Sequence, residues 1–338
     1  MKTTAEQFET DIKELAHDLV RAYGLTYTAT GTTADDIAMY RWMDYRLRHI
    51  SLEPRLVKKS SRFPVSNLPA EINDALSAIE ARFANGEDVN PYLSKTTIRN
   101  DVSSSKKQRR TDGLWADWRI HHLHLTNIPI APGERFSERS DWLLFVMVYD
   151  DAVAFIDVRS HNERDLWTQD DLLKEFIDSW PEQAEPYRVK GMRVVSGPKS
   201  SDDIKQLRNA GITTVVEHNG EHYFGPGGGV TSAVTSTAVT RACIDVLRNT
   251  HQLALWLDAP DNAIRLELNQ LGIAHPEFVL AISASSGLAI AERGKPDLAW
   301  ALPELNAQGR RTSFGTVQQT LLPAWAIPAL IAHVAPSP

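Results

Sequence analysis

The sequence predicts an α+β fold, in which an N-terminal helical region precedes a central antiparallel sheet with one packed helix and a C-terminal α/β unit. Three observations predict it: apolar residues at helical spacing in the first third, strand-like apolar runs in the middle, and alternating helix and hairpin patterns in the last third. A length of 338 residues is enough for two or three domains. We expect a helical region at 1–100, a basic linker or loop at 101–114, a histidine-bearing antiparallel sheet domain at 115–187 and an α/β domain at 188–338.

Three amphipathic helices are predicted in the first hundred residues. The first ends at Gly24, the second begins at Thr33, and the third begins at Asn67 to Pro69 and ends at Gly86. Their apolar stripes consist of Phe8, Ile12, Leu15 and Leu19, then Ile37, Tyr40, Met43, Leu47 and Ile50, and finally Ile72, Leu76, Ile79 and Phe83.

The central region changes to strand patterns. Residues 118–125 alternate in character, 141–149 form a near-continuous apolar run as in a buried strand, and 152–158 follow after an Asp150-Asp151 turn. A helix capped by Thr168 and stopped by Pro181 is expected to pack on this sheet.

The C-terminal unit alternates helix and strand signals. We expect a helix at 204–211, a hairpin at 212–225 turning on Asn219-Gly220, a helix at 231–250 and one or two strands within 278–292.

Charge and cysteine usage indicate the compartment and the kind of partner. The net charge is -7, yet residues 41–119 carry 15 Lys and Arg against 10 Asp and Glu, a weak sign of a polyanionic partner. A single cysteine and a charged N-terminal stretch without an apolar core predict a cytoplasmic protein. The uncharged tail from Thr312 is broken by Pro323 and Pro328, so we expect no membrane association.

The most informative local feature is the run Ile-His-His-Leu-His-Leu at 120–125. Strand alternation places His122 and His124 side by side on one face, about 7 Å apart, and turns His121 to the other. His161 follows the third strand and is expected at the same edge of the sheet, where Arg139 and Arg159 can also converge.

Two chemistries fit such a group. In metal-free RNA cleavage, one histidine takes the proton from a ribose 2′-OH, a second protonates the leaving 5′-oxygen, and arginines stabilise the transition state. In metal-assisted hydrolysis, His122 and His124 hold Zn²⁺ or another divalent metal, with Asp157 as a further ligand. A third interpretation makes the histidines a structural polar cluster.

A glycine-rich segment at 225–229 is a second candidate. Its backbone N–H groups can face an anion or nucleotide ahead of a helix, although it matches neither the Walker A nor the dinucleotide pattern. A tight connection is the alternative. The residues of this candidate site are Gly227, Gly228, Gly229, Thr231 and Ser232.

The order of motifs within 115–181 resembles bacterial toxin ribonucleases of the RelE/ParE type. The resemblance lies in Trp118-Arg119-Ile120, in an arginine-introduced strand from Arg139 to Phe145, and in a third strand, 155–161, that ends at His161. It covers about a fifth of the chain and implies cleavage of RNA without a metal. The chain is larger and more acidic than those toxins, and the histidine-rich strand is not part of their pattern. A general likeness to bacterial proteins with an Ile-His-His-Leu-His-Leu strand implies no function.

These observations favour an RNA-directed endoribonuclease of toxin or phage-defence type, working without cofactor. An antitoxin-like inhibitory partner, or inhibition by residues 188–338 of the chain itself, would then control it. A metal-dependent hydrolase built on the same histidines and a non-catalytic binding module remain as alternatives.

Overall fold

The computed structural model describes residues 2–30, 32–64, 68–168, 170–191, 198, 200–283 and 287–334, without the side chains of 32–36 and of Pro296. The side chain of Thr33 and the whole of Asn67, two of the expected helix starts, lie outside these residues. The chain divides into two compact units, one formed by 1–43 with 239–338 and the other by 44–238. Their bounds differ from the domains expected from the sequence, because the first unit joins both ends of the chain.

The unit 44–238 is built on a four-stranded sheet of order β1-β4-β3-β2. As expected, β2, β3 and β4 pair antiparallel, and the chain turns between β3 and β4 at Asp150-Asp151. The N-terminal region is not purely helical, because Leu56–Lys59 forms β1, which pairs parallel to β4. The other strands are β2 (His121–His124), β3 (Trp142–Val148) and β4 (Ala152–Ser160), with a bulge in β3 between Phe145 and Val146.

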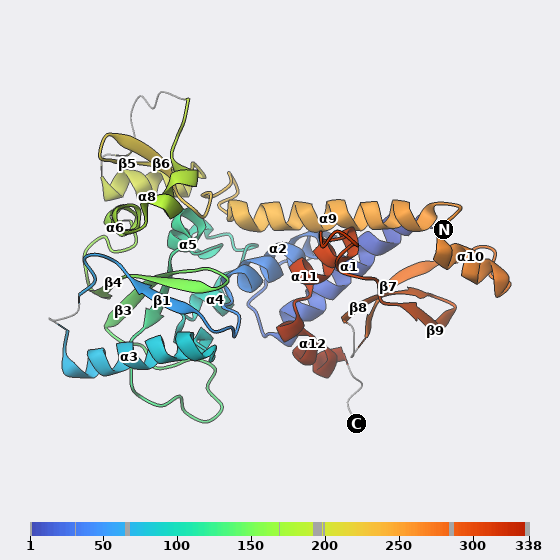
Figure 1. Cartoon of the computed structure of the whole chain (residues 1–338), viewed down its shortest axis with the longest axis horizontal. Helices are drawn as coiled ribbons and strands as arrows, with labels where there is room; N and C mark the ends of the chain where they lie inside the picture. The colour runs from blue at the N-terminus through green and yellow to red at the C-terminus, as the bar shows by residue number, and fades with distance from the viewer. Residues whose placement is uncertain are drawn as a thin grey trace. The chain divides into compact units, whose positions relative to one another are not determined.

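Each face of this sheet has its own apolar core. On one face lies α3 (Ala70–Asn85) (Figure 1). Its Ile72, Leu76 and Phe83 belong to one core cluster with strand residues that include Leu144 and Phe155. On the other face, the apolar side of α6 (Asp171–Ser179) packs against the sheet. The helix contributes Leu172, Leu173, Phe176 and Ile177, and the strands contribute Leu143, Phe145, Ala154 and Ile156. Successive side chains of β3 and β4 point alternately into the two cores, so both faces of these strands are buried, as expected for a central hairpin.

The remaining elements of this unit are short. They are α4 (Thr96–Arg99), α5 (Gly113–Trp118), α7 (Pro181–Ala184), α8 (Ser201–Ala210), β5 (Val215–His218), β6 (Glu221–Phe224) and three 3₁₀ turns at Asn90–Tyr92, Lys107–Arg109 and Glu185–Tyr187. The β5–β6 hairpin turns on Asn219 and Gly220 with φ of 53° and 79°, which confirms the predicted turn.

Residues 101–112 form turns and bends with one 3₁₀ turn at Lys107–Arg109, which agrees with the expected loop, and α5 begins at Gly113. Two local expectations are wrong. Residues 118–120 do not belong to the strand, because α5 runs to Trp118 and Arg119 ends it with a φ of 61°. Thr168 does not cap α6: its hydroxyl donates to the Asp165 carbonyl at 3.2 Å, and the helix begins at Asp171.

The unit formed by both chain ends contains a second, three-stranded sheet of order β7-β8-β9. The segment 278–292, expected to contain one or two strands, contains two, and a third strand was not expected. The helix predicted at 231–250 begins at Thr237 instead. The elements are α1 (Thr4–Ala22), most of α2 (Thr32–Arg48), α9 (Thr237–Asp258), α10 (Ala263–Gln270), β7 (Phe278–Ser283), β8 (Gly287–Glu292), β9 (Lys295–Trp300), α11 (Ser313–Leu321), a 3₁₀ turn at Ala324–Ala326 and α12 (Ile327–Val334).

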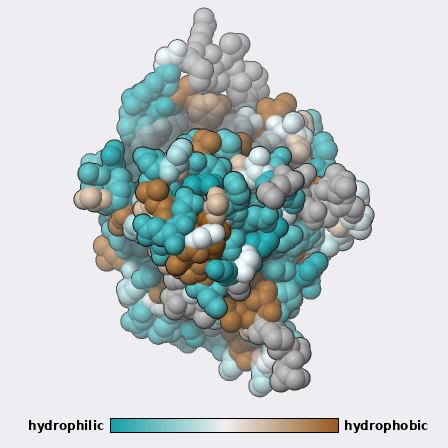
Figure 2. All heavy atoms as spheres, turned by 90° about the vertical axis from the view of Figure 1, so that its right-hand side faces the viewer, coloured by the Kyte–Doolittle hydropathy of each residue, from teal (hydrophilic) through white to brown (hydrophobic). Residues whose placement is uncertain are grey.

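Within this unit, α1 contacts β7 and α12. In the view onto the side where α10 and β9 lie, hydrophobic surface forms separate patches among hydrophilic side chains (Figure 2). Among the described residues, no helix combines the length and the apolar character that crossing a bilayer requires.

Candidate functional site

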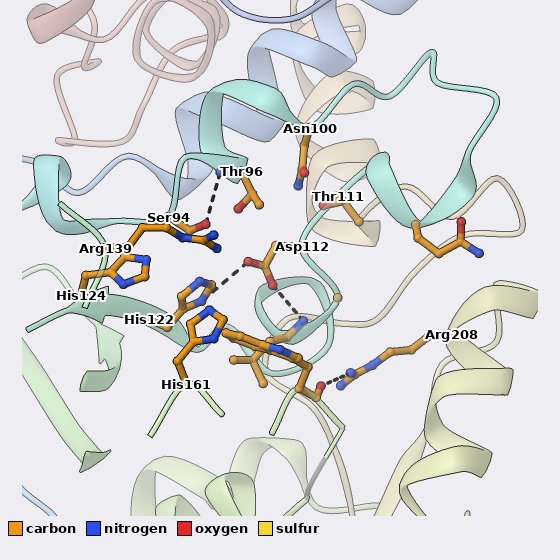
Figure 3. Close-up of a pocket in the computed structure, with 14 residues that line it drawn as sticks. Ser94, Thr96, Asn100, Thr111, Asp112, His122, His124, Arg139, His161 and Arg208 are labelled. Carbon is orange, nitrogen blue, oxygen red and sulfur yellow. Dashed lines mark hydrogen bonds and ion pairs between the residues drawn. The ribbon is translucent and has the colours of Figure 1, made fainter. Parts of the chain in front are cut away.

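A pocket of about 400 Å³ lies in the unit 44–238 and brings the three predicted histidines together (Figure 3). His122 and His124 come from β2, and His161 follows the end of β4. Around them stand polar side chains from distant parts of this unit. The lining consists of Ser94, Thr96, Asn100, Gln108, Thr111, Asp112, Gly113, Leu114, His122, His124, Arg139, His161, Trp167 and Arg208.

The strand geometry explains the pair on β2. His122 pairs with Phe145 and His124 with Leu143, both of which belong to the core on the α6 face of the sheet. Because alternate residues of a strand share a face, both imidazoles point to that side, as predicted. β2 is the last strand of the sheet, so the rings lie at its margin rather than beneath α6.

His161 reaches the same pocket across the beginning of β3. Its backbone N–H donates to the Asp141 carbonyl at 2.6 Å, immediately before β3 starts. The rings of His124 and His161 are stacked, with centroids 6.2 Å apart and planes inclined by 16°. Trp167 meets the rings of His122 and His161 edge-on, at 4.8 and 5.8 Å between centroids. The indole therefore packs against two of the three imidazoles.

A carboxylate that the sequence interpretation did not include supports His122. Asp112 Oδ2 lies 3.8 Å from Nδ1 of His122 and 3.4 Å from Nη2 of Arg48. The other oxygen, Oδ1, accepts hydrogen bonds from the backbone N–H groups of Leu114 and Trp115 and thus caps α5. Asp112 precedes a glycine and a short apolar helix, and this N-cap signal was available in the sequence.

Arg48 is buried behind Asp112 and is held by further contacts. Its Nη1 lies 3.4 Å from Asp44 Oδ2, and its Nη2 donates to the Thr96 hydroxyl at 3.1 Å. Thr111 in turn donates to Asp44 at 2.7 Å. A buried charge needs paired and hydrogen-bonded neighbours, and this network supplies them on both sides of the guanidinium.

Burial sets the protonation of the histidines on β2. Burial lowers the pKa of His122 to about 4, although the Asp112 carboxylate opposes the shift. Burial also lowers the pKa of His124, against an opposing hydrogen bond with the Ser140 backbone. Both imidazoles are consequently neutral at pH 7, because each pKa lies below the ordinary value near 6.5. Burial tends to raise the pKa of Asp112, but Arg48 and His122 outweigh it and keep the carboxylate ionised.

His121 belongs to the other face of the sheet, as predicted. It pairs with Val146, its ring lies 6.3 Å from that of Trp115, and it does not line the pocket. Burial lowers the pKa of His121 to about 3.

The two predicted arginines have different places. Arg139 is exposed and lines the pocket beside His124 (Figure 3). Arg159 lies away from the lining and instead forms ion pairs with Asp157 at 2.7 Å, Glu163 at 3.3 Å and Asp171 at 2.6 Å. The structure therefore does not bring Arg159 to the histidines, because the carboxylates around β4 and α6 already hold its guanidinium.

The glycine-rich segment packs against α5 instead of facing a ligand. The N–H groups of Gly227 and Gly229 donate to the carbonyls of Asp117 and Ala116, and that of Gly228 to the Gly225 carbonyl. That of Thr231 donates to Thr235, and an ideal Cβ on Gly227 would lie 2.2 Å from a carbonyl oxygen. We predicted an anion site on these residues and Ser232, but the segment forms a tight backbone connection instead. The helix that was expected to follow it directly begins only at Thr237.

The metal-binding alternative lacks one of its expected ligands. Asp157 lies outside the pocket lining, accepts a hydrogen bond from Arg159 at 2.7 Å, and does not join His122 and His124. Among the described residues, no group of three or more His, Cys, Asp or Glu side chains is arranged to hold a metal ion.

No protein-family model, curated protein or solved structure matches this chain.

Proposed function

We propose that this pocket is the active site of an endoribonuclease that cleaves RNA by histidine acid–base catalysis without a metal. The observation that carries the proposal is that three imidazoles and the exposed cation of Arg139 line one pocket of about 400 Å³. Proton transfer at two positions, plus a cation for the phosphate charge, is what transesterification of an RNA phosphodiester requires.

His122 is assigned the role of general base. It is neutral at pH 7, and Asp112 lies 3.8 Å from its Nδ1, where the carboxylate can orient the ring and stabilise the imidazolium that forms. His122 takes the proton of the 2′-OH, and O2′ attacks the phosphorus atom. A bound phosphodiester also adds negative charge, which favours protonated imidazole.

His161 is assigned the role of general acid, since its ring is partly exposed and lines the same pocket as His122. It protonates the leaving 5′-oxygen as the P–O bond breaks, leaving a 2′,3′-cyclic phosphate and a 5′-hydroxyl. The stacked ring of His124, together with Arg139, binds the non-bridging phosphate oxygens.

The test is cleavage of an end-labelled RNA oligonucleotide by purified protein in EDTA. We expect cyclic-phosphate products, no cleavage where a 2′-deoxynucleotide replaces the scissile one, and loss of activity in His122→Ala, His124→Ala and His161→Ala. His251→Ala, on the exposed surface of α9, is the matched control and should cleave as the wild type does.

Other outcomes would contradict the proposal. Cleavage that is lost in EDTA and restored by Zn²⁺ would indicate the metal-dependent alternative. Absence of cleavage, with histidine variants that lose only stability, would indicate a binding module. In bacteria, the toxin or phage-defence role predicts growth arrest and altered total RNA on expression of the wild type, but not of His124→Ala.

A further inference from the structure

A second pocket, of about 500 Å³, adjoins the histidine pocket. The two share part of their lining, namely Gln108, Thr111, Gly113, Trp167 and Arg208. One of the shared residues, Trp167, is 37% exposed although it has a large aromatic side chain. The two pockets therefore adjoin along residues that include Trp167.

Two lysines give this second pocket a positive rim. Lys107 lies in the 3₁₀ turn before α5, and Lys205 lies on α8. Both are exposed, and among the described residues neither forms an ion pair. The acidic residue of the lining, Asp165, contacts Arg164 at 3.4 Å. The lysines are thus available to an anionic ligand.

The interior of the second pocket is apolar. Besides Trp167, it is lined by Val230 and Val234 from the segment that follows the glycine run. Val234 has a φ of 57°, a conformation that a β-branched residue rarely adopts. Arg110 donates to the neighbouring Ala233 carbonyl at 2.7 Å and helps to keep this strained turn in place. Strain of this kind is often found where a ligand binds.

The backbone of Trp167 is held by Arg208. Arg208 Nη1 donates to the Trp167 carbonyl at 2.5 Å, and Arg208 Nε pairs with the buried Asp117. The guanidinium also lies over the ring of Trp118, 4.8 Å from its centroid. A preorganised aromatic ring beside an apolar wall and a cationic rim is suited to a nucleobase with its phosphate.

We infer that this pocket is a subsite for the nucleotide next to the scissile phosphate, and that the substrate is single-stranded RNA. The inference rests on the proposed function of the histidine pocket. The base stacks on Trp167 and packs against Val230 and Val234, and the adjoining phosphate lies between Lys107 and Lys205. A duplex cannot place a base there, because its bases remain stacked and paired.

The experiment measures binding and cleavage separately. Affinity for a fluorescein-labelled single-stranded RNA oligonucleotide is followed by anisotropy in EDTA over a range of salt concentrations. Cleavage is measured on a dinucleoside monophosphate, whose only phosphate is the scissile one and which therefore lacks the phosphate assigned to Lys107 and Lys205. The variants are Lys107→Gln and Lys205→Gln, and the matched control is Lys58→Gln, an exposed lysine on β1.

Each lysine variant should weaken oligonucleotide binding and make the slope of log K against log salt shallower by about 0.7, the value for one phosphate contact on a single strand. Cleavage of the dinucleoside should stay at the wild-type level, and Lys58→Gln should change neither quantity. Trp167→Ala should weaken oligonucleotide binding about ten-fold, whereas Trp167→Phe keeps most of it. The unlabelled duplex of the same sequence should compete poorly.

Each remaining result is decisive. If both lysine variants bind like the control, or if the wild type binds no single-stranded RNA, the subsite is wrong, whether or not the dinucleoside is cleaved. If binding depends on both lysines but no RNA is cleaved, the pocket is a binding site for single-stranded RNA and the proposed catalytic function is wrong.

Discussion

Asp112 and His122 are linked by a contact of 3.8 Å between Oδ2 and Nδ1, and the same oxygen lies 3.4 Å from Nη2 of Arg48. One carboxylate thus connects a buried cation to an imidazole that opens into the pocket. Its second oxygen caps α5, the helix that leads directly into β2. The element that places His122 and the charge that stabilises its protonated form therefore depend on a single side chain.

Asp112→Asn should separate these two roles. Asparagine keeps an N-cap acceptor, so α5 should persist, but Arg48 loses one of its two carboxylate partners. We expect the free energy of unfolding to fall by roughly 2 kcal/mol and cleavage to slow by at least about ten-fold, since His122 loses the group that stabilises its imidazolium.

Urea denaturation and RNA cleavage measure the two effects, and Asp112→Ala is the companion variant. It removes the cap as well and should cost about 1 kcal/mol more. A wild-type cleavage rate in Asp112→Asn would show that the carboxylate has no part in the chemistry.

Acid should destabilise the protein over a defined pH window. The pKa of His122 is lowered to about 4 by burial, below the ordinary value of 6.5, so between these values the unfolded chain binds a proton that the folded protein does not. The free energy of unfolding then falls as the pH decreases from 6.5 towards 4, on the order of 3 kcal/mol for this residue alone. His121, whose pKa is lowered to about 3, adds a loss of the same sign.

Urea denaturation at a series of pH values tests this expectation with the variant His122→Gln. For the wild type, uptake of one proton by His122 on unfolding adds about 1.4 kcal/mol per pH unit to the slope of the free energy of unfolding against pH. In His122→Gln this contribution should be absent within the window. Identical slopes for wild type and variant would mean that His122 titrates normally in the folded protein.

The sequence predicted those parts of the site that local periodicity determines. Alternation along β2 placed His122 and His124 on one face, and the apolar run of β3 predicted the sheet they border. Asp112 was missed because it follows a polar, basic stretch without periodicity, although it begins a helix. Arg48 was missed because its role depends on packing between segments more than sixty residues apart in the chain. No spacing rule predicts such a contact.

Two other errors have physical causes of the same kind. β1 is a four-residue strand of mixed polarity at the edge of the sheet, and its pairing with β4 is set by tertiary contact, not by pattern. The glycines at 225–229 were interpreted as an opening for an anion, yet they permit the close approach of a backbone. Glycine serves both purposes, and only the neighbouring chain distinguishes them.

The packing role of the glycine segment can be measured. A Cβ at Gly225 would lie 2.0 Å from the Asp117 carbonyl oxygen, so Gly225→Ala requires backbone movement next to α5. We expect a loss of about 3 kcal/mol or more, or failure to fold. Gly220→Ala is the control, because its φ of 79° is unfavourable for alanine but nothing lies within 4 Å of the added carbon. It should cost only about 1–2 kcal/mol. Equal thermal unfolding of the two variants would contradict the packing role.

The two predicted arginines should behave in opposite ways. Arg139 is exposed and lines the pocket, so Arg139→Gln should leave the free energy of unfolding within about 0.5 kcal/mol of the wild type. It should slow RNA cleavage by about 100-fold, the effect expected when a group that stabilises transition-state charge is removed.

Arg159→Gln should do the reverse. Its guanidinium joins β4 to Asp171 at the start of α6, and it also holds the partly buried Asp157, whose pKa is raised by burial against the opposing influence of Arg159. Loss of this cation leaves the carboxylates to repel one another, so stability should fall by roughly 1–2 kcal/mol while cleavage of a dinucleoside monophosphate stays unchanged. Cleavage lost in Arg159→Gln, measured where the variant is still fully folded, would mean that the guanidinium moves into the pocket when RNA binds.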